Sequence, residues 1–188
     1  MDTGDDPERW CPELDDIIPE NDRRGYDIHE VICSIVDNGH FVEVMKDWAT
    51  NVAVGFGRMD GRTVGFIGNQ PLVKAGCLDM DSSDKAARFI RFCDSFSIPL
   101  VYLVDTPGFL PGTNQEHGGI LRHGAKLVYA NCEATVPKIT IVLRKMYGGC
   151  RAALCGEGMG TDFLFYWPTG QGALVGAETF FILFANLS

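Results

Sequence analysis

Hydrophobic and polar residues follow one another along the first third of the chain in patterns that predict a helix and three strands. In residues 27–37 (DIHEVICSIVD) the apolar side chains recur at helical spacing, so we expect a short helix there. After an Asn38-Gly39 turn, the runs FVEVM, NVAVGFGRM and RTVGFIGN predict strands. Asp60-Gly61 joins the last two runs, and an Asp-Gly pair between two such runs indicates a hairpin.

The rest of the chain repeats a cycle of helix and buried strand. Residues 81–96 carry an apolar stripe at helical spacing, with Asp81 to Ser83 as candidate N-caps, and Pro99 should end that helix. PLVYLVD and KITIVLR are continuous apolar runs, as expected of parallel strands covered on both faces. GGILRHGAKLVYANCEATVP and GGCRAALCGEGMG predict helices that open at paired glycines, and DFLFYWP predicts a third strand. We therefore expect one domain with an α/β fold.

The composition fits one globular domain of 188 residues, with 46% hydrophobic and 22% charged residues. The stretch GALVGAETFFILFANLS contains Glu178 and is too short and interrupted to span a bilayer, and MDTGDDPERW lacks the features of a secretory signal. Seven cysteines without a C-x-x-C pair indicate a reducing compartment. The four histidines lack metal-site spacing, so we expect no metal.

The formal net charge of -9 is concentrated near the N-terminus. Residues 1–24 hold nine acidic side chains against three arginines, which leaves that segment at -6. We interpret it as a solvated linker in preference to a docking tail. Basic residues elsewhere are scattered, which argues against a nucleic-acid partner.

A loop that begins Asp105-Thr-Pro-Gly follows the strand PLVYLVD and suggests a γ-phosphate sensor. Nucleotide triphosphatases also need G-x-x-x-x-G-K-[ST], yet no lysine here follows a glycine, and the Asn-Lys-x-Asp and G-x-G-x-x-G motifs are absent. The nucleotide hypothesis is therefore disfavoured, and we expect Asp105 to cap its own loop.

Two glycine pairs, Gly118-Gly119 and Gly148-Gly149, stand where predicted helices follow buried strands and their loops. Backbone N–H groups at such a position can hold an oxyanion, and glycine lets a flat substrate approach closely. Taken alone, the pairs fit a role in packing or turns better. His117 and His123 have no G-x-S-x-G partner, so we interpret them as surface or capping residues.

Together these segments resemble the carboxyltransferase (β) subunit of biotin-dependent acyl-CoA carboxylases, in the group of propionyl-CoA carboxylase β and methylmalonyl-CoA decarboxylase α. The resemblance is carried by residues 69–96, by residues 99–149, which end in RKMYGG, and by WPT at 167–169. It implies a crotonase-like spiral of ββα units, truncated at its C-terminal end and corresponding to the C-terminal half of the subunit. Residues 1–24 would be an acidic inter-domain connection, and 25–188 a partial acyl-CoA carboxyltransferase C-terminal domain.

The resemblance also assigns site residues. In the family, the second glycine of R-K-x-Y-G-G and its successor donate backbone N–H groups to the ureido oxygen of biotin, which places Gly149 and Cys150 in that role. Ala152 falls at a position that tunes acyl chain preference. The other substrate-binding positions implied are Pro107, Gly108, Phe109, Gly118, Gly119 and Gly148. The cofactor implied is biotin on a separate carrier protein or domain, without a metal.

The activity implied is carboxyl transfer between biotin and a short-chain acyl-CoA, such as propionyl-CoA or methylmalonyl-CoA, in bacterial cytoplasm or the mitochondrial matrix. The partners implied are a biotin carboxyl carrier protein or biotin carboxylase subunit, acyl-CoA, the subunit's own N-terminal half and other carboxyltransferase subunits, with no nucleic acid and no membrane. The chain alone is expected to be inactive. The alternatives are a non-catalytic fragment or assembly module that retains only the subunit interface, and a crotonase-type hydratase, which lacks support because no glycine loop holds an acidic pair.

The motif departs from the family pattern in two residues: Cys150 replaces a small residue, and Arg151 an aromatic one. An arginine beside the biotin site would either disturb it or point to solvent.

Overall fold

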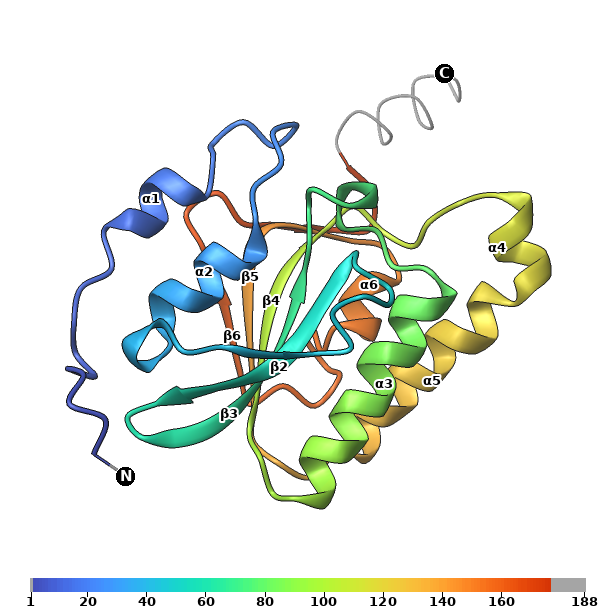
Figure 1. The fold of residues 1–188 in the computed structure, drawn as a ribbon. Coiled ribbons are helices and arrows are strands. Elements are labelled where there is room, and N and C mark those ends of the chain that lie inside the picture. The colour runs from blue at the N-terminus through green and yellow to red at the C-terminus, as the bar shows by residue number, and fades with distance from the viewer. Residues whose placement is uncertain (1, 177–188) are drawn as a thin grey trace.

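The structure, a computed structural model, describes residues 2–176 (Figure 1). Its strands form one mixed sheet in the order β1-β2-β3-β4-β5-β6, with β7 pairing with β5. The strands are β1 (Val42–Val44), β2 (Val52–Met59), β3 (Arg62–Asn69), β4 (Leu100–Thr106), β5 (Lys138–Tyr147), β6 (Phe163–Tyr166) and β7 (Gln171–Ala173). The first three strands pair antiparallel and the others join in parallel. Most of the apolar C-terminal stretch, from residue 177 onward, lies outside the described residues.

Helices cover both faces of the sheet. They are α1 (Glu13–Ile17), α2 (Ile28–Ile35), α3 (Met80–Ser95), α4 (Thr113–Gly118), α5 (Ile120–Glu133) and α6 (Cys150–Ala153), with 3-10 turns at Asp37–Gly39 and Lys74–Gly76. The long helices α3 and α5 lie side by side on one face, and α1 and α2 lie on the other (Figure 1). Each face has its own apolar core. The predicted α/β architecture is therefore confirmed.

The hairpin and the buried strands agree with the prediction. Asp60 and Gly61 both have positive φ, 51° and 70°, as a two-residue hairpin turn between twisted strands requires. All seven residues of β4 are buried. A strand covered by helices on both faces has no polar face, which explains its uninterrupted apolar sequence.

Several element boundaries differ from the prediction. Asp79, and not a residue from 81 to 83, caps α3: its carboxylate accepts from the N–H of Ser82 at 2.9 Å, while the Ser82 hydroxyl accepts from the N–H of Asp79 at 2.8 Å. The glycine pair 118–119 does not simply open a helix, because Gly118 ends α4 and Gly119, with φ 89°, turns the chain into α5. The helix predicted after Gly149 is the single turn α6.

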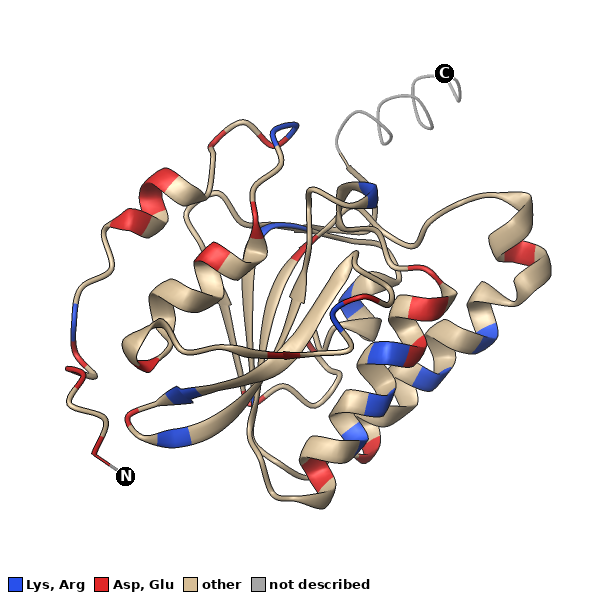
Figure 2. Cartoon of the chain, in the orientation of Figure 1, with Lys and Arg blue, Asp and Glu red and all other residues tan. Residues whose placement is uncertain are grey.

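The acidic N-terminal segment is docked on the domain, so its interpretation as a solvated linker was wrong. Leu14 and Ile18 are buried against α2. Arg9 donates to the carbonyl oxygens of Ser34 at 2.6 Å and Val36 at 2.9 Å. These carbonyl groups at the C-terminal end of α2 are therefore hydrogen-bonded. Acidic residues are frequent along this segment, whereas Lys and Arg alternate with acidic residues on α3 and α5 (Figure 2). Its assignment as an inter-domain connection stays a prediction.

Among residues 2–176, no helix combines the length and the apolar character that crossing a membrane requires.

Candidate functional site

The loops that follow β4 and β5 meet at one edge of the sheet, because the two strands are parallel neighbours. Leu78, which precedes α3, pairs through its backbone with the loop after β4. The N–H of Leu78 donates to the carbonyl of Gly108 at 3.1 Å, and the N–H of Leu110 donates to the carbonyl of Leu78 at 2.7 Å. This pairing fixes the backbone on both sides of Phe109.

Two adjacent backbone donors lie at the start of α6. Within the described part of the chain, the N–H groups of Gly149 and Cys150 have no acceptor, whereas the N–H of Gly148 donates to the carbonyl of Ala173 at 3.0 Å. Gly149 is exposed and Cys150 is buried. A buried donor without an acceptor costs about 1–3 kcal/mol, so a bound acceptor would stabilise the N–H of Cys150 in particular.

The ring of Phe109 adjoins this donor pair. A β-carbon built on Gly149 would lie 3.4 Å from Cε2 of Phe109, and one built on Gly124 of α5 would lie 2.9 Å from Cζ. The ring is therefore held between two glycines, one from α5 and one from the start of α6. Among the substrate-binding positions that the resemblance implies, Phe109 therefore lies next to Gly149.

The other predicted wall residues lie differently. A β-carbon on Gly118 would meet the side chain of Met80, and Gly119 forms the joint between α4 and α5. Pro107 is exposed, and Gly108 has φ 145°. The structure therefore does not bring Gly118 or Gly119 into contact with Gly149. His117 is exposed, and Nδ1 of His123 lies 2.9 Å from Oδ2 of Asp84, in keeping with surface roles.

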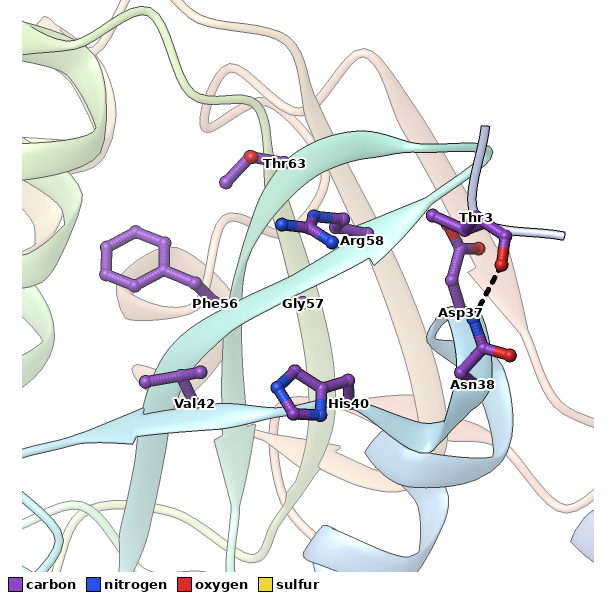
Figure 3. A pocket seen from close by; sticks show the side chains of 9 residues that line it. All are labelled: Thr3, Asp37, Asn38, His40, Val42, Phe56, Gly57, Arg58 and Thr63. Atoms are coloured by element: carbon purple, nitrogen blue, oxygen red, sulfur yellow. Dashed lines mark hydrogen bonds between the residues drawn. The ribbon is translucent and has the colours of Figure 1, made fainter. Parts of the chain in front are cut away.

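An apolar depression of about 390 Å³ continues from Phe109 along α5. Its lining consists of Phe109, Leu110, Pro111, Glu116, Ile120, Leu121, Gly124, Ala125 and Val128. A second hollow of about 390 Å³ lies at the other end of the molecule, where Thr3 hydrogen-bonds Asp37 and the side chains of Val42 and Phe56 form the opposite wall (Figure 3). None of the predicted site residues lines this second hollow, so the depression beside Phe109 is the one that adjoins the candidate site.

The side chain of Cys150 is a neutral structural group. It is fully buried, and burial raises the pKa of its thiol to about 12. The Thr106 hydroxyl lies 4.0 Å from its sulfur. A thiol that stays protonated is a poor nucleophile, so the residue can act at this site through its backbone N–H alone.

The side chain of Arg151 forms an ion pair in which the carboxylate is largely exposed to solvent. Its Nη2 lies 3.7 Å from Oε2 of Glu157, in the turn that follows α6. Ala152 is half-buried on α6. The arginine that departs from the expected motif is thus held by a carboxylate.

Asp105 does not cap its own loop, so that expectation was wrong. It is buried at the end of β4 and pairs with Arg144 of β5, whose Nε lies 2.7 Å from Oδ2. Its other oxygen accepts from the N–H of Lys145 at 3.2 Å. Sequence reasoning missed Arg144, although a signal was visible: the apolar run PLVYLVD ends in Asp105, and the apolar run KITIVLR ends in Arg144.

No group of three or more His, Cys, Asp or Glu side chains that could hold a metal ion occurs within residues 2–176.

Comparisons with known proteins agree on one family. A model described as the carboxyl transferase domain matches residues 1–186. Methylmalonyl-CoA decarboxylase subunit alpha of Veillonella parvula is 55% identical over 176 residues, which cover 94% of this chain and 35% of that protein. The methylmalonyl-CoA carboxyltransferase 12S subunit of Propionibacterium freudenreichii subsp. shermanii is 57% identical over 166 residues, or 88% of this chain and 32% of that one.

Among solved structures, a transcarboxylase 12S hexamer with hydrolysed methylmalonyl-coenzyme A bound has a TM-score of 0.94 at 52% identity, covering 97% of this chain and 35% of that chain. The likeness confirms the predicted crotonase-like fold. The chain spans about a third of the length of the relatives that it matches.

Proposed function

Because the chain belongs to the carboxyl transferase family, whose domain model matches residues 1–186, we propose that it carries the biotin-accepting part of an acyl-CoA carboxyltransferase. The substrate proposed is a short-chain acyl-CoA, propionyl-CoA or methylmalonyl-CoA. The names of the relatives support this class, since they are methylmalonyl-CoA and propionyl-CoA enzymes.

The observation that carries the proposal is the unpaired donor pair of Gly149 and Cys150. Two N–H groups on consecutive residues suit the ureido oxygen of biotin, which gains negative charge as the carboxyl group leaves. Fixed donors at that oxygen stabilise the developing charge without having to reorganise. Gly149 has no β-carbon to block the approach, and its φ of -62° places no strain on the turn.

When bound, biotin supplies the carboxyl group and, after its loss, a nitrogen that can take the α-proton of the acyl-CoA. The chain's own contribution is to bind and orient. Phe109 offers an apolar ring beside the donors, and the depression along α5 extends that apolar wall. An apolar wall excludes water and so strengthens the hydrogen bonds made at the donor pair. We propose that Pro107, Gly108 and Gly148 hold this wall and that Ala152 adjusts acyl chain preference.

We propose further that acyl-CoA is held by another part of the enzyme, an N-terminal half, and that biotin arrives on a carrier protein or on a biotin carboxylase subunit. The chain spans 35% of methylmalonyl-CoA decarboxylase subunit alpha, which leaves room for such a half in the relatives. On this proposal the chain of 188 residues binds biotin but does not transfer a carboxyl group by itself.

The test is an assay with free carboxybiotin and propionyl-CoA, combined with a direct measurement of biotin binding by calorimetry. We expect the chain to bind biotin and to transfer no carboxyl group until a separately produced acyl-CoA-binding half of the family is added. Absence of biotin binding would refute the proposed role, and turnover by the chain alone would refute its dependence on a second half.

An assembly module is the second candidate, favoured by one observation. The edge strand β6 exposes Phe163, Phe165 and Tyr166, and the rings of Phe163 and Phe165 stack 6.1 Å apart. Exposed aromatic clusters mark interaction surfaces. In the same mixing experiment, a stable complex on size-exclusion chromatography without biotin binding or turnover would favour this candidate.

A further inference from the structure

Arg144 joins three parts of the chain inside the protein. Its Nε lies 2.7 Å from Oδ2 of Asp105, and both side chains are almost fully buried, at 4% and 2% exposed. Its Nη1 donates to the carbonyl oxygens of Asn21 at 3.1 Å and Arg24 at 2.7 Å. Its guanidinium carbon lies 4.7 Å from the centre of the Tyr26 ring. One arginine thus ties residues 21–26, which we call the connector segment, to β4 and β5.

The strand register changes at this point. Val104 pairs with Val142, but Thr106 pairs with Met146, so Asp105 faces a stretch of β5 that has two more residues than β4. The carboxylate of Asp105 bridges this irregularity by accepting from the N–H of Lys145 at 3.2 Å. Bulges of this kind redirect a strand. Here the redirected end of β5 runs directly into Gly148, Gly149 and Cys150.

Lys145 adds a second tie to the connector segment. Its Nζ donates to the carbonyl of Asp22 at 2.6 Å and lies 3.5 Å from Oδ2 of the same residue. Immediately before the donor pair, the N–H of Gly148 donates to the carbonyl of Ala173 in β7. The backbone that leads to the donor pair is therefore fixed at both ends, by the connector segment and by β7.

We propose that Arg144 is a positioning residue for the N–H groups of Gly149 and Cys150, and that the connector segment acts through it as a clamp on the biotin-accepting loop. The inference rests on the proposed function for what the loop binds. The physical reason is that a buried guanidinium must keep all its partners, because losing any one leaves a charge or a carbonyl unpaired. Arg144 therefore fixes the positions of the connector segment, Asp105 and the end of β5 relative to one another.

The experiment compares Arg144→Lys with Arg58→Lys in the full chain. Lysine keeps a positive charge beside Asp105, but its one ammonium group cannot replace both Nε at the carboxylate and Nη1 at the two backbone carbonyls. Arg58 is exposed on β2, away from the connector segment, and serves as the matched control. Tyr26→Leu, which keeps the ion pair but removes the ring, and Lys145→Met, which removes the second tie, provide milder variants should Arg144→Lys not fold.

Three quantities are measured for each variant: the thermal midpoint, the ¹⁵N–¹H resonances of Gly149 and Cys150, and biotin affinity by calorimetry. We expect Arg144→Lys to move both resonances and to weaken biotin binding by about tenfold, a loss in keeping with a small misplacement of binding groups. Tyr26→Leu and Lys145→Met should move the same resonances by smaller amounts, and Arg58→Lys should move neither.

If the variants lower the thermal midpoint yet leave both resonances and the biotin affinity of the folded protein unchanged, Arg144 is only a structural residue and the inference is overturned. It is overturned equally if Arg144→Lys fails to fold and the two milder variants leave the resonances in place. A wild-type chain that binds no biotin would refute the proposed function instead, while the resonances would still decide whether the clamp exists.

Discussion

The ring of Phe109 occupies the space that a side chain on Gly124 would need. A β-carbon on Gly124 would lie 2.9 Å from Cζ and 3.0 Å from Cε1 of that ring, closer than carbon atoms normally approach. Phe109 belongs to the loop after β4, and Gly124 lies within α5. The glycine inside this helix is therefore explained by the ring, which sets the distance between α5 and the loop beside Gly149.

Replacing Gly124 by alanine should push Phe109 away from its position. Alanine improves helix propensity by about 1 kcal/mol, but crowding a packed site costs about 1–3 kcal/mol, so we expect a net loss of about 1 kcal/mol. Biotin affinity should fall with it, because the ring adjoins the donor pair. Urea unfolding and calorimetry measure the two effects.

The double variant Phe109→Leu with Gly124→Ala is the control for this prediction. Leucine is smaller than the ring, so stability should recover and the two substitutions should be non-additive. A Gly124→Ala protein that is more stable than wild type, with unchanged biotin affinity, would contradict the role given to this contact.

Gly148→Ala and Gly149→Ala should separate stability from binding. Gly148 has φ 58°, which an alanine adopts at a cost of about 1 kcal/mol, whereas Gly149 has φ -62° and a β-carbon there meets Phe109 at an ordinary 3.4 Å. We expect Gly149→Ala to unfold within about 0.5 kcal/mol of wild type and to lose biotin binding, because its methyl group stands beside the donors. Equal stability losses in the two variants, with binding retained in both, would contradict this assignment.

Cys150→Ala should keep biotin binding. The N–H group remains, and the thiol that is removed is buried and neutral, with its pKa raised to about 12 by burial. We expect a stability loss of about 1 kcal/mol from the lost packing. Iodoacetamide labelling followed by mass spectrometry should leave Cys150 unmodified in the native protein and modify it in urea. Loss of binding in a folded Cys150→Ala protein would mean that the sulfur itself takes part.

The periodicity of the sequence was enough to predict the sheet and its main helices, because β4, β5 and α3 each carry a strong local pattern. The Asp60-Gly61 turn was predictable for the same reason, since its backbone geometry depends on those two residues. The short elements α1, α4 and β7 were not predicted. They bury few side chains, and packing on the rest of the domain stabilises them more than local propensity does.

The candidate site was predictable only in part. The R-K-x-Y-G-G resemblance singled out Gly149 and Cys150, and the structure adds that their N–H groups have no acceptor among the described residues. The contact of Phe109 with Gly124 and the bond between Arg144 and the carbonyl of Arg24 depend on tertiary packing. The second of these joins residues 120 positions apart, a separation that no local pattern encodes.

Lys85→Met should destabilise the protein strongly. Lys85 is buried on α3, and its Nζ donates to the carbonyl oxygens of Trp48 at 2.8 Å and Val52 at 2.7 Å. Methionine fills a similar volume but leaves those carbonyls unpaired, so we expect a loss of about 2–4 kcal/mol in urea unfolding. Lys46→Met, at an exposed position, is the matched control and should change stability by less than about 0.5 kcal/mol. A small effect of Lys85→Met would show that water reaches these carbonyls.

Stability should fall in alkaline solution, in part because of Cys155. Burial raises the pKa of its thiol to about 11, whereas a thiol in the unfolded chain ionises near about 8.5. The stability from this group is therefore fully present below pH about 8.5 and is lost as the pH rises through about 11, at up to about 1.4 kcal/mol per pH unit. Cys155→Ala removes this dependence, so the gap in unfolding free energy between wild type and variant should shrink from pH 8 to 11. Val142→Ala, which removes a buried side chain that cannot ionise, should keep a constant gap; parallel curves for both variants would contradict the assignment.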